Sequence, residues 1–293
     1  MIPQSNHPAV PPQRSSPTRR SVLAIAAGAS LAAASWPGRP AHATTPPVIE
    51  DIYLLIGQSN MAGRGPIEDQ DKAELPGVYL FDSDERWTPS SNEPMGINRY
   101  STVEEPGPNT LLSLGYTFGR HLQESTGRTL GLVVNPKGGT RMSEWRKEDP
   151  TGSFPLYAEA VRRARQALRR SPSAQLRGII WHQGEGDNNE DSAERYLPML
   201  SQMVADLRGD LRSPGAVFVA GEVGTWQGRG AHINPQIRKV GEHIDLATWV
   251  SSEGLTTHET DSDPWGPHFD SASQRTFGVR YADAVLDLAP LPA

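Results

Sequence analysis

Short apolar runs that alternate with helical stripes constrain the fold of this chain more than any other feature. Runs such as Ile52–Ile56 and Leu130–Val134 are apolar throughout, as in strands buried on both faces. Between them, apolar residues recur at helical spacing, as in the stripe that contains Leu114, Phe118 and Leu122. Buried strands separated by helices predict a parallel sheet covered on both sides. We therefore predict an α/β fold, a three-layer α/β/α sandwich of the flavodoxin-like type.

The same pattern predicts where the elements lie. The expected strands are 52–56, 78–81, 130–134, 178–181, 216–220 and 248–250. The expected helices cover 111–122, 157–168, 196–207, 233–244 and 277–288, the fourth with the weakest stripe.

The first 43 residues differ in composition and predict an export signal. Arg19 and Arg20 form a twin-arginine motif, and the small, apolar run 21–35 follows. Ala41-His42-Ala43 then matches an A-x-A cleavage site. A membrane-spanning helix needs about 20 apolar residues, and the sequence contains no such run. We expect a twin-arginine signal peptide that is cleaved after Ala43, and a secreted or periplasmic protein.

The remaining residues, 44–293, are expected to form one domain in which acidic residues outnumber basic ones. They hold 24 basic and 34 acidic residues, because the first 43 contain four arginines and no carboxylate. A net charge of −10 argues against a nucleic-acid or anionic-membrane partner. The chain also has no cysteine, which excludes disulfides, a thiol nucleophile and thiolate metal sites.

Four polar clusters lie at the expected ends of strands or before the last helix, where parallel sheets bind ligands. They are Gly57–Gly63 (G-Q-S-N-M-A-G), Asn135–Thr140 (N-P-K-G-G-T), His182–Asp187 (H-Q-G-E-G-D) and Asp261–Asp270 (D-S-D-P-W-G-P-H-F-D). Three of them have an ordinary alternative: a helix N-cap for the serine, a plain turn for the glycines, a surface position for the last histidine. A metal site at His182, Glu185 and Asp187 is a further alternative, but its spacing matches no common motif.

Together the clusters resemble a known family. The motifs that carry the resemblance are G-Q-S-N-M-A-G, G-G-T-x(4)-W (138–145), W-H-Q-G-E (181–185) and H-F-D-x(3)-Q-R-x-x-G-x-R-Y-A (268–282). They are similar to the carbohydrate acetylesterases related to sialate O-acetylesterase, including acetylxylan esterases of carbohydrate esterase family 6, within the SGNH-hydrolase superfamily. The resemblance covers about 49–289. It implies a serine esterase that removes O-acetyl groups from carbohydrate through an acyl-enzyme, without metal or cofactor.

The resemblance also assigns catalytic roles. Ser59 would be the nucleophile and His268 the general base. A serine hydroxyl is a weak nucleophile until a base takes its proton. The oxyanion hole would consist of the backbone N–H groups of Ser59 and Gly139 together with the side-chain amide of Gln183.

The sequence departs from the family at the triad acid. Many relatives carry aspartate three residues before the histidine, but Trp265 occupies that position here. Asp263 lies five residues before His268, and a two-residue insertion would explain the shift. The alternative acid is Glu185. We favour Asp263 and keep Glu185 open.

The substrate site is expected to include Asn60 and three tryptophans, Trp145, Trp226 and Trp265, whose rings could stack on sugars; the alternative for each ring is a place in the core. The expected partner is an acetylated carbohydrate such as acetylxylan. Competing functions are a sialate O-acetylesterase or another glycan deacetylase, a metal-dependent hydrolase, and a non-catalytic carbohydrate-binding protein. A binding protein needs no nucleophile and base together.

Overall fold

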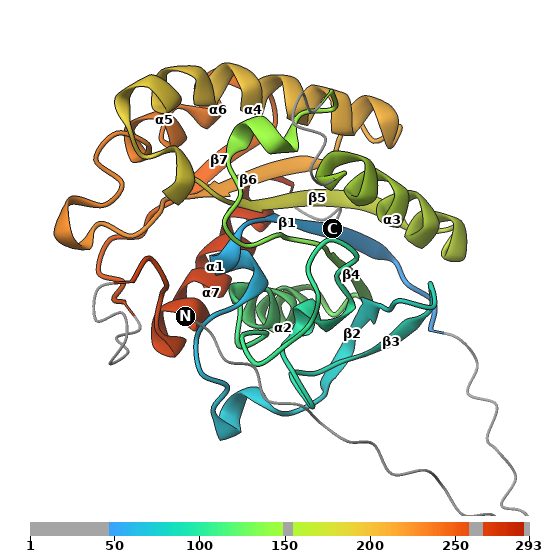
Figure 1. The fold of residues 1–293 in the computed structure, drawn as a ribbon. Coiled ribbons are helices and arrows are strands. Elements are labelled where there is room, and N and C mark those ends of the chain that lie inside the picture. The colour runs from blue at the N-terminus through green and yellow to red at the C-terminus, as the bar shows by residue number, and fades with distance from the viewer. Residues whose placement is uncertain (1–46, 149–154, 258–265, 290–293) are drawn as a thin grey trace, which may run out of the picture. The chain divides into compact units, whose positions relative to one another are not determined.

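A seven-stranded sheet between two helical layers forms the frame of the computed structural model (Figure 1). The structure describes residues 47–148, 155–257 and 266–289. The predicted signal peptide, Asp263 and Trp265 lie outside the described residues.

The strands follow the order β3-β2-β4-β1-β5-β6-β7, and all neighbouring pairs are parallel except β2 and β3. Their bounds are β1 Asp51–Gly57, β2 Leu75–Phe81, β3 Trp87–Ser90, β4 Leu130–Val134, β5 Gln175–His182, β6 Val217–Gly221 and β7 Ala247–Val250. The helices are α1 Ser59–Ala62, α2 Leu114–Thr126, α3 Leu156–Arg170, α4 Glu190–Asp210, α5 Asn234–Ile237, α6 Val240–His243 and α7 Ser271–Leu288.

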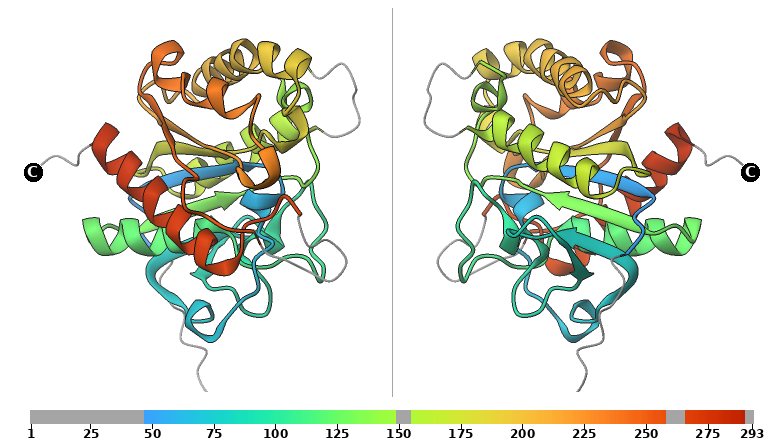
Figure 2. Two further views of the ribbon diagram at one scale, coloured as in Figure 1. Left: turned by 90° about the vertical axis from the view of Figure 1, so that its left-hand side faces the viewer. Right: turned by 90° about the vertical axis from the view of Figure 1, so that its right-hand side faces the viewer.

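The two faces of the sheet carry separate hydrophobic cores. Helices α3, α4, α5 and α6 cover one face, and α2 and α7 lie side by side on the other (Figures 1 and 2). Strand β1, at the centre, alternates between them: Ile52, Leu54 and Ile56 belong to the first core, and Tyr53 and Leu55 to the second. Side chains of a strand point alternately to opposite faces, so a continuously apolar strand serves both layers.

The predicted sandwich is confirmed, and some elements differ in detail. Strand β3 was not expected, because it is short, contains Pro89 and pairs antiparallel at the sheet edge, where proline is tolerated. The helix expected at 233–244 is two short helices, α5 and α6. Within the described residues, no helix has the length and apolar character needed to cross a bilayer.

Candidate active site

Ser59 lies at the sharp turn between β1 and α1. Gly57 has a φ of +133°, and a Cβ there would lie 2.2 Å from the carbonyl oxygen of His182. The next residue, Gln58, donates its backbone N–H to the same carbonyl at 2.8 Å and is the N-cap of α1. Ser59 is therefore the first helical residue and does not cap the helix. Its side chain is free for another partner, although the residue is only 6% exposed.

That partner is His268, which is 209 residues away in the chain. Its Nε2 lies 3.0 Å from Ser59 Oγ, a hydrogen-bond distance. The segment before α7 is held from two sides: Trp226 Nε1 donates to Gly266 O at 2.9 Å, and Thr257 Oγ1 donates to the carbonyl oxygens of Gly266 and His268. An imidazole nitrogen in this position can accept the serine proton and later return it.

Asn60, next to the serine, joins this segment to the β1 turn. Its Oδ1 accepts from the backbone N–H of Phe269 at 3.1 Å, and its Nδ2 donates to Pro267 O at 2.9 Å and to Glu185 Oε1 at 2.5 Å. The residue is completely buried. In this structure the Asn60 amide is occupied by protein groups, and a contact between Asn60 and substrate stays a prediction.

Glu185 contacts Asn60 and the ring of His182. The Glu185 side chain is 8% exposed, and its Oε1 lies 3.7 Å from His182 Nε2. Burial by itself raises the pKa of this carboxyl, but His182 and the Asn60 hydrogen bond outweigh that effect, so the pKa lies below its usual value. Among the described residues, Glu185 makes no hydrogen bond to His268. The role of Asp263 as triad acid stays a prediction, since that residue lies outside the described ranges.

The loop after β4 passes beside the serine. Lys137 donates its backbone N–H to Gly57 O at 2.9 Å, and a Cβ on Gly138 would lie 3.7 Å from the Cβ of Ser59. Gly139 follows with a φ of +73° and is exposed. This close approach of glycine backbone suits an oxyanion donor, a role that stays a prediction for Gly139.

The side-chain amide of Gln183 is bonded to protein groups. Its Nε2 donates to Thr140 O at 3.0 Å and to Asp187 Oδ2 at 2.6 Å, so both amide hydrogens are used. Asp187 Oδ2 also accepts from the backbone N–H of Met142 at 2.8 Å. In this arrangement Gln183 and Asp187 hold the turn that follows Gly139, and the role of Gln183 as an oxyanion donor stays a prediction.

Trp145 lies in the core rather than at the substrate site. It is fully buried, packs edge-to-face on Trp181 with ring centroids 5.3 Å apart, and donates its Nε1–H to Thr140 Oγ1. The predicted stacking role is therefore wrong for Trp145. Trp226 is half-buried and packs edge-to-face on Phe269 at 5.2 Å. The predicted role of Trp265 lies outside the described residues.

An ion pair that no sequence motif predicted lies close to Ser59. Arg64 donates to Glu104 Oε1 at 3.0 Å, while Glu104 Oε2 accepts from the backbone N–H of Gly138 at 3.1 Å. Arg64 follows the G-Q-S-N-M-A-G motif directly, which is a signal that could have found it. Glu104 lies in a loop with no recognisable motif, so only the structure reveals it.

The metal alternative gains no support from the geometry. His182 and Glu185 lie together, but Asp187 faces Gln183 and Met142 instead. Within the described ranges, no group of three His, Asp or Glu residues is arranged to hold a metal ion.

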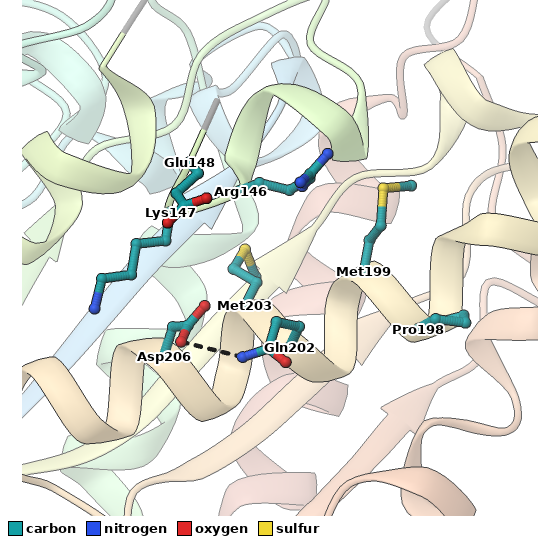
Figure 3. Close-up of a pocket in the computed structure, with 8 residues that line it drawn as sticks. All are labelled: Arg146, Lys147, Glu148, Pro198, Met199, Gln202, Met203 and Asp206. Atoms are coloured by element: carbon teal, nitrogen blue, oxygen red, sulfur yellow. Dashed lines mark hydrogen bonds between the residues drawn. The ribbon is translucent and has the colours of Figure 1, made fainter. Parts of the chain in front are cut away.

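A cavity of about 610 Å³ lies between α4 and residues 146–148 (Figure 3). Its lining includes Arg146, Met199 and Met203, and Gln202 donates to Asp206 along its floor. Neither the serine nor the histidine of the site lines this cavity, so it is not where the ester bond would be broken.

A family match extends over most of the chain. Residues 49–287 match the model of a family described as carbohydrate esterase, sialic acid-specific acetylesterase. The chain belongs to this family. The protein is accordingly a carboxylic ester hydrolase of the carbohydrate acetylesterase class, with acetylated carbohydrate as its substrate.

Individual relatives agree with this membership. A protein of Arabidopsis thaliana named a probable carbohydrate esterase is 26% identical over 250 residues, which cover 80% of this chain and 90% of the relative. Its X-ray structure superposes with a TM-score of 0.67 at 22% identity and covers 82% of this chain and 98% of the other. The crystal structure of NanS gives a TM-score of 0.62 at 18% identity, with 83% and 98% coverage. These likenesses show that the chain shares the α/β fold of these proteins.

Proposed function

We propose that the protein is a secreted serine esterase that removes acetyl groups from a neutral glycan of the acetylxylan type. The single observation that carries the mechanism is the 3.0 Å distance between Ser59 Oγ and His268 Nε2. A non-catalytic binding protein has no use for this contact. The net charge of −10 for residues 44–293 favours a neutral glycan over an anionic one.

The first half of the proposed reaction acylates the serine. His268 Nε2 accepts the proton of Ser59 Oγ as the oxygen attacks the acetyl carbonyl carbon. The negative charge on the carbonyl oxygen is stabilised by the backbone N–H groups of Ser59 and Gly139, each donor being worth about 10²–10³ in rate. The bond between the carbonyl carbon and the sugar oxygen then breaks, and His268 gives its proton to the departing sugar hydroxyl.

The second half releases acetate. A water molecule gives a proton to His268 and attacks the acetyl-enzyme carbonyl. The bond to Ser59 Oγ breaks, and His268 returns the proton to that oxygen. The carboxylate proposed to orient the His268 ring is Asp263, five residues before it in the sequence.

The test is acetate release by the mature protein from acetylated xylan and from O-acetylated sialic acid, compared as kcat/KM. We expect the neutral polymer to be the better substrate. A higher kcat/KM for the sialate would replace the proposed substrate with the one in the family's description, which is the specific observation that favours this second candidate. Binding of either glycan without acetate release would contradict the enzyme mechanism itself.

A further inference from the structure

Asn60 is the only side chain among the described residues that bonds on both sides of His268. It accepts from Phe269 N and donates to Pro267 O, the two residues that flank the histidine. Asn60 also follows Ser59 directly, so one side chain fixes the nucleophile turn and the base segment relative to each other. A shift of this amide would change the 3.0 Å distance between the two reacting side chains.

The carboxylate of Glu185, together with Pro267 O and the N–H of Phe269, determines which way the Asn60 amide faces. An asparagine side chain has an oxygen that only accepts and a nitrogen that only donates. Because Glu185 Oε1 can only accept, Asn60 must present Nδ2 to it, and Oδ1 then faces Phe269 N. The amide turned by 180° would point its oxygen at the Glu185 carboxylate and at Pro267 O, and its NH₂ at the N–H of Phe269.

Glu185 is itself held at the end of β5. Its Oε1 lies 3.7 Å from His182 Nε2. The hydroxyl of Tyr281 on α7 donates its single hydrogen to Trp181 O at 2.7 Å, so it accepts from His182 Nδ1 at 3.1 Å. The bond from Tyr281 therefore fixes the ring of His182 with Nε2 facing Glu185, at a distance too long for a hydrogen bond.

We propose that Glu185 is a positioning residue, which acts on His268 through Asn60 and is not the carboxylate that orients the His268 ring. The inference rests on the proposed function only in taking Ser59 and His268 as the reacting pair. It separates two roles: a triad acid must bond the imidazole, whereas a positioning residue needs only to accept from Asn60.

The two roles predict opposite results for Glu185→Gln. A glutamine keeps an oxygen that can accept from Asn60 Nδ2, so a positioning role leaves kcat within about fivefold of wild type. Loss of a triad carboxylate costs about 10⁴ in kcat, because the histidine is then held in the wrong tautomer. Glu185→Ala removes the acceptor and is expected to lower kcat by about 10- to 100-fold with little change in KM. Glu190→Ala, an exposed carboxylate at the start of α4, is the matched control.

A double-mutant cycle tests the path through Asn60. Residues that act through one another give non-additive effects. We expect Asn60→Ala to lower kcat as Glu185→Ala does, and the double variant to equal Asn60→Ala within about twofold. Multiplied losses in the double variant, or a loss of about 10³ or more in Glu185→Gln, would overturn the proposal. If thermal unfolding shows that Glu185→Ala does not fold, Glu185→Gln decides alone.

The substrate for this cycle is 4-nitrophenyl acetate, with the rate of Ser59 modification by a fluorophosphonate as a second readout. Neither probe contains a sugar. A wild-type protein that turns over the aryl acetate but no acetylated glycan refutes the proposed substrate, while the cycle still decides the role of Glu185. A wild-type protein whose Ser59 reacts with neither probe overturns both proposals.

Discussion

At Ser59 one hydroxyl is expected to carry the reaction, and its replacement is the most direct test. Ser59→Ala should lower kcat by about 10³-fold or more, because removal of a nucleophile costs several decades. The melting temperature should change little, since among the described residues the lost hydroxyl bonds only the His268 ring. Acetate release and thermal unfolding measure the two effects, with Ser192→Ala on α4 as control. A variant that keeps more than about a tenth of wild-type kcat would show that Ser59 is not the nucleophile.

Asp187 offers a test based on pH. Burial raises the pKa of its carboxyl above the usual value, although hydrogen bonds from Gln183 and Met142 act in the opposite direction. The folded protein therefore keeps this proton at a pH where the unfolded chain has lost it. Stability contributed by the site is present at low pH and falls as pH rises through the folded pKa.

Asp187→Asn removes this titration while keeping an oxygen that can accept from Gln183 and Met142. We expect the variant to gain stability relative to wild type as pH rises from about 3 to 7, measured by urea unfolding at each pH. Asp191→Asn, an exposed neighbour on α4, should show no such trend. A variant that loses stability relative to wild type as pH rises would have the wrong sign for a carboxyl whose pKa is raised in the folded state.

The motifs predicted which residue types gather at the site, but not the directions of their side chains. Ser59 and His268 lie together as expected. Asn60, Gln183 and Trp145 occur in the expected segments, yet each is buried and bonded to protein groups. Sequence spacing places a residue on an element, whereas its partners come from loops far away in the chain. Contacts between such loops are not encoded in any local pattern.

At the scale of elements, the loop after β6 supports the histidine segment through Trp226. Trp226→Phe keeps the ring against Phe269 but removes the hydrogen bond to Gly266 O. We expect kcat on 4-nitrophenyl acetate to fall by about 3- to 10-fold with KM nearly unchanged, because the base is less well held. Trp249→Phe on the edge strand β7 is the control. An effect of Trp226→Phe on KM for glycans alone would instead favour the predicted stacking role.

The buried strands were predictable because their hydrophobic pattern is local and strong. β1, β4 and β5 are continuously apolar over four or more residues, as sheets covered on both faces require. β3 carries no such signal, since edge strands bury only part of their surface. The sequence pattern does not predict the break between α5 and α6 either, because the apolar residues on both sides keep the spacing of one helix.

For the molecule as a whole, the site depends on completing the sheet. Ser59 follows β1, at the centre of the sheet, and His268 precedes α7, near the end of the chain. Ser59 and His268 are 209 positions apart in the chain, and the residues between them build most of the frame, so the pair can meet only after nearly the entire domain has folded. A route of export that carries folded protein would therefore deliver an assembled active site.

This dependence sharpens the prediction that residues 1–43 direct export by the twin-arginine route. Replacing Arg19 and Arg20 together by lysine should trap the precursor inside the cell, whereas Arg14→Lys, outside the motif, should be exported normally. Because folding precedes export on this route, the trapped precursor should already hydrolyse 4-nitrophenyl acetate. Immunoblots and activity of the separated cell fractions measure both effects. Undiminished export of the double variant would contradict the proposed route, and a trapped but inactive precursor would contradict folding before export.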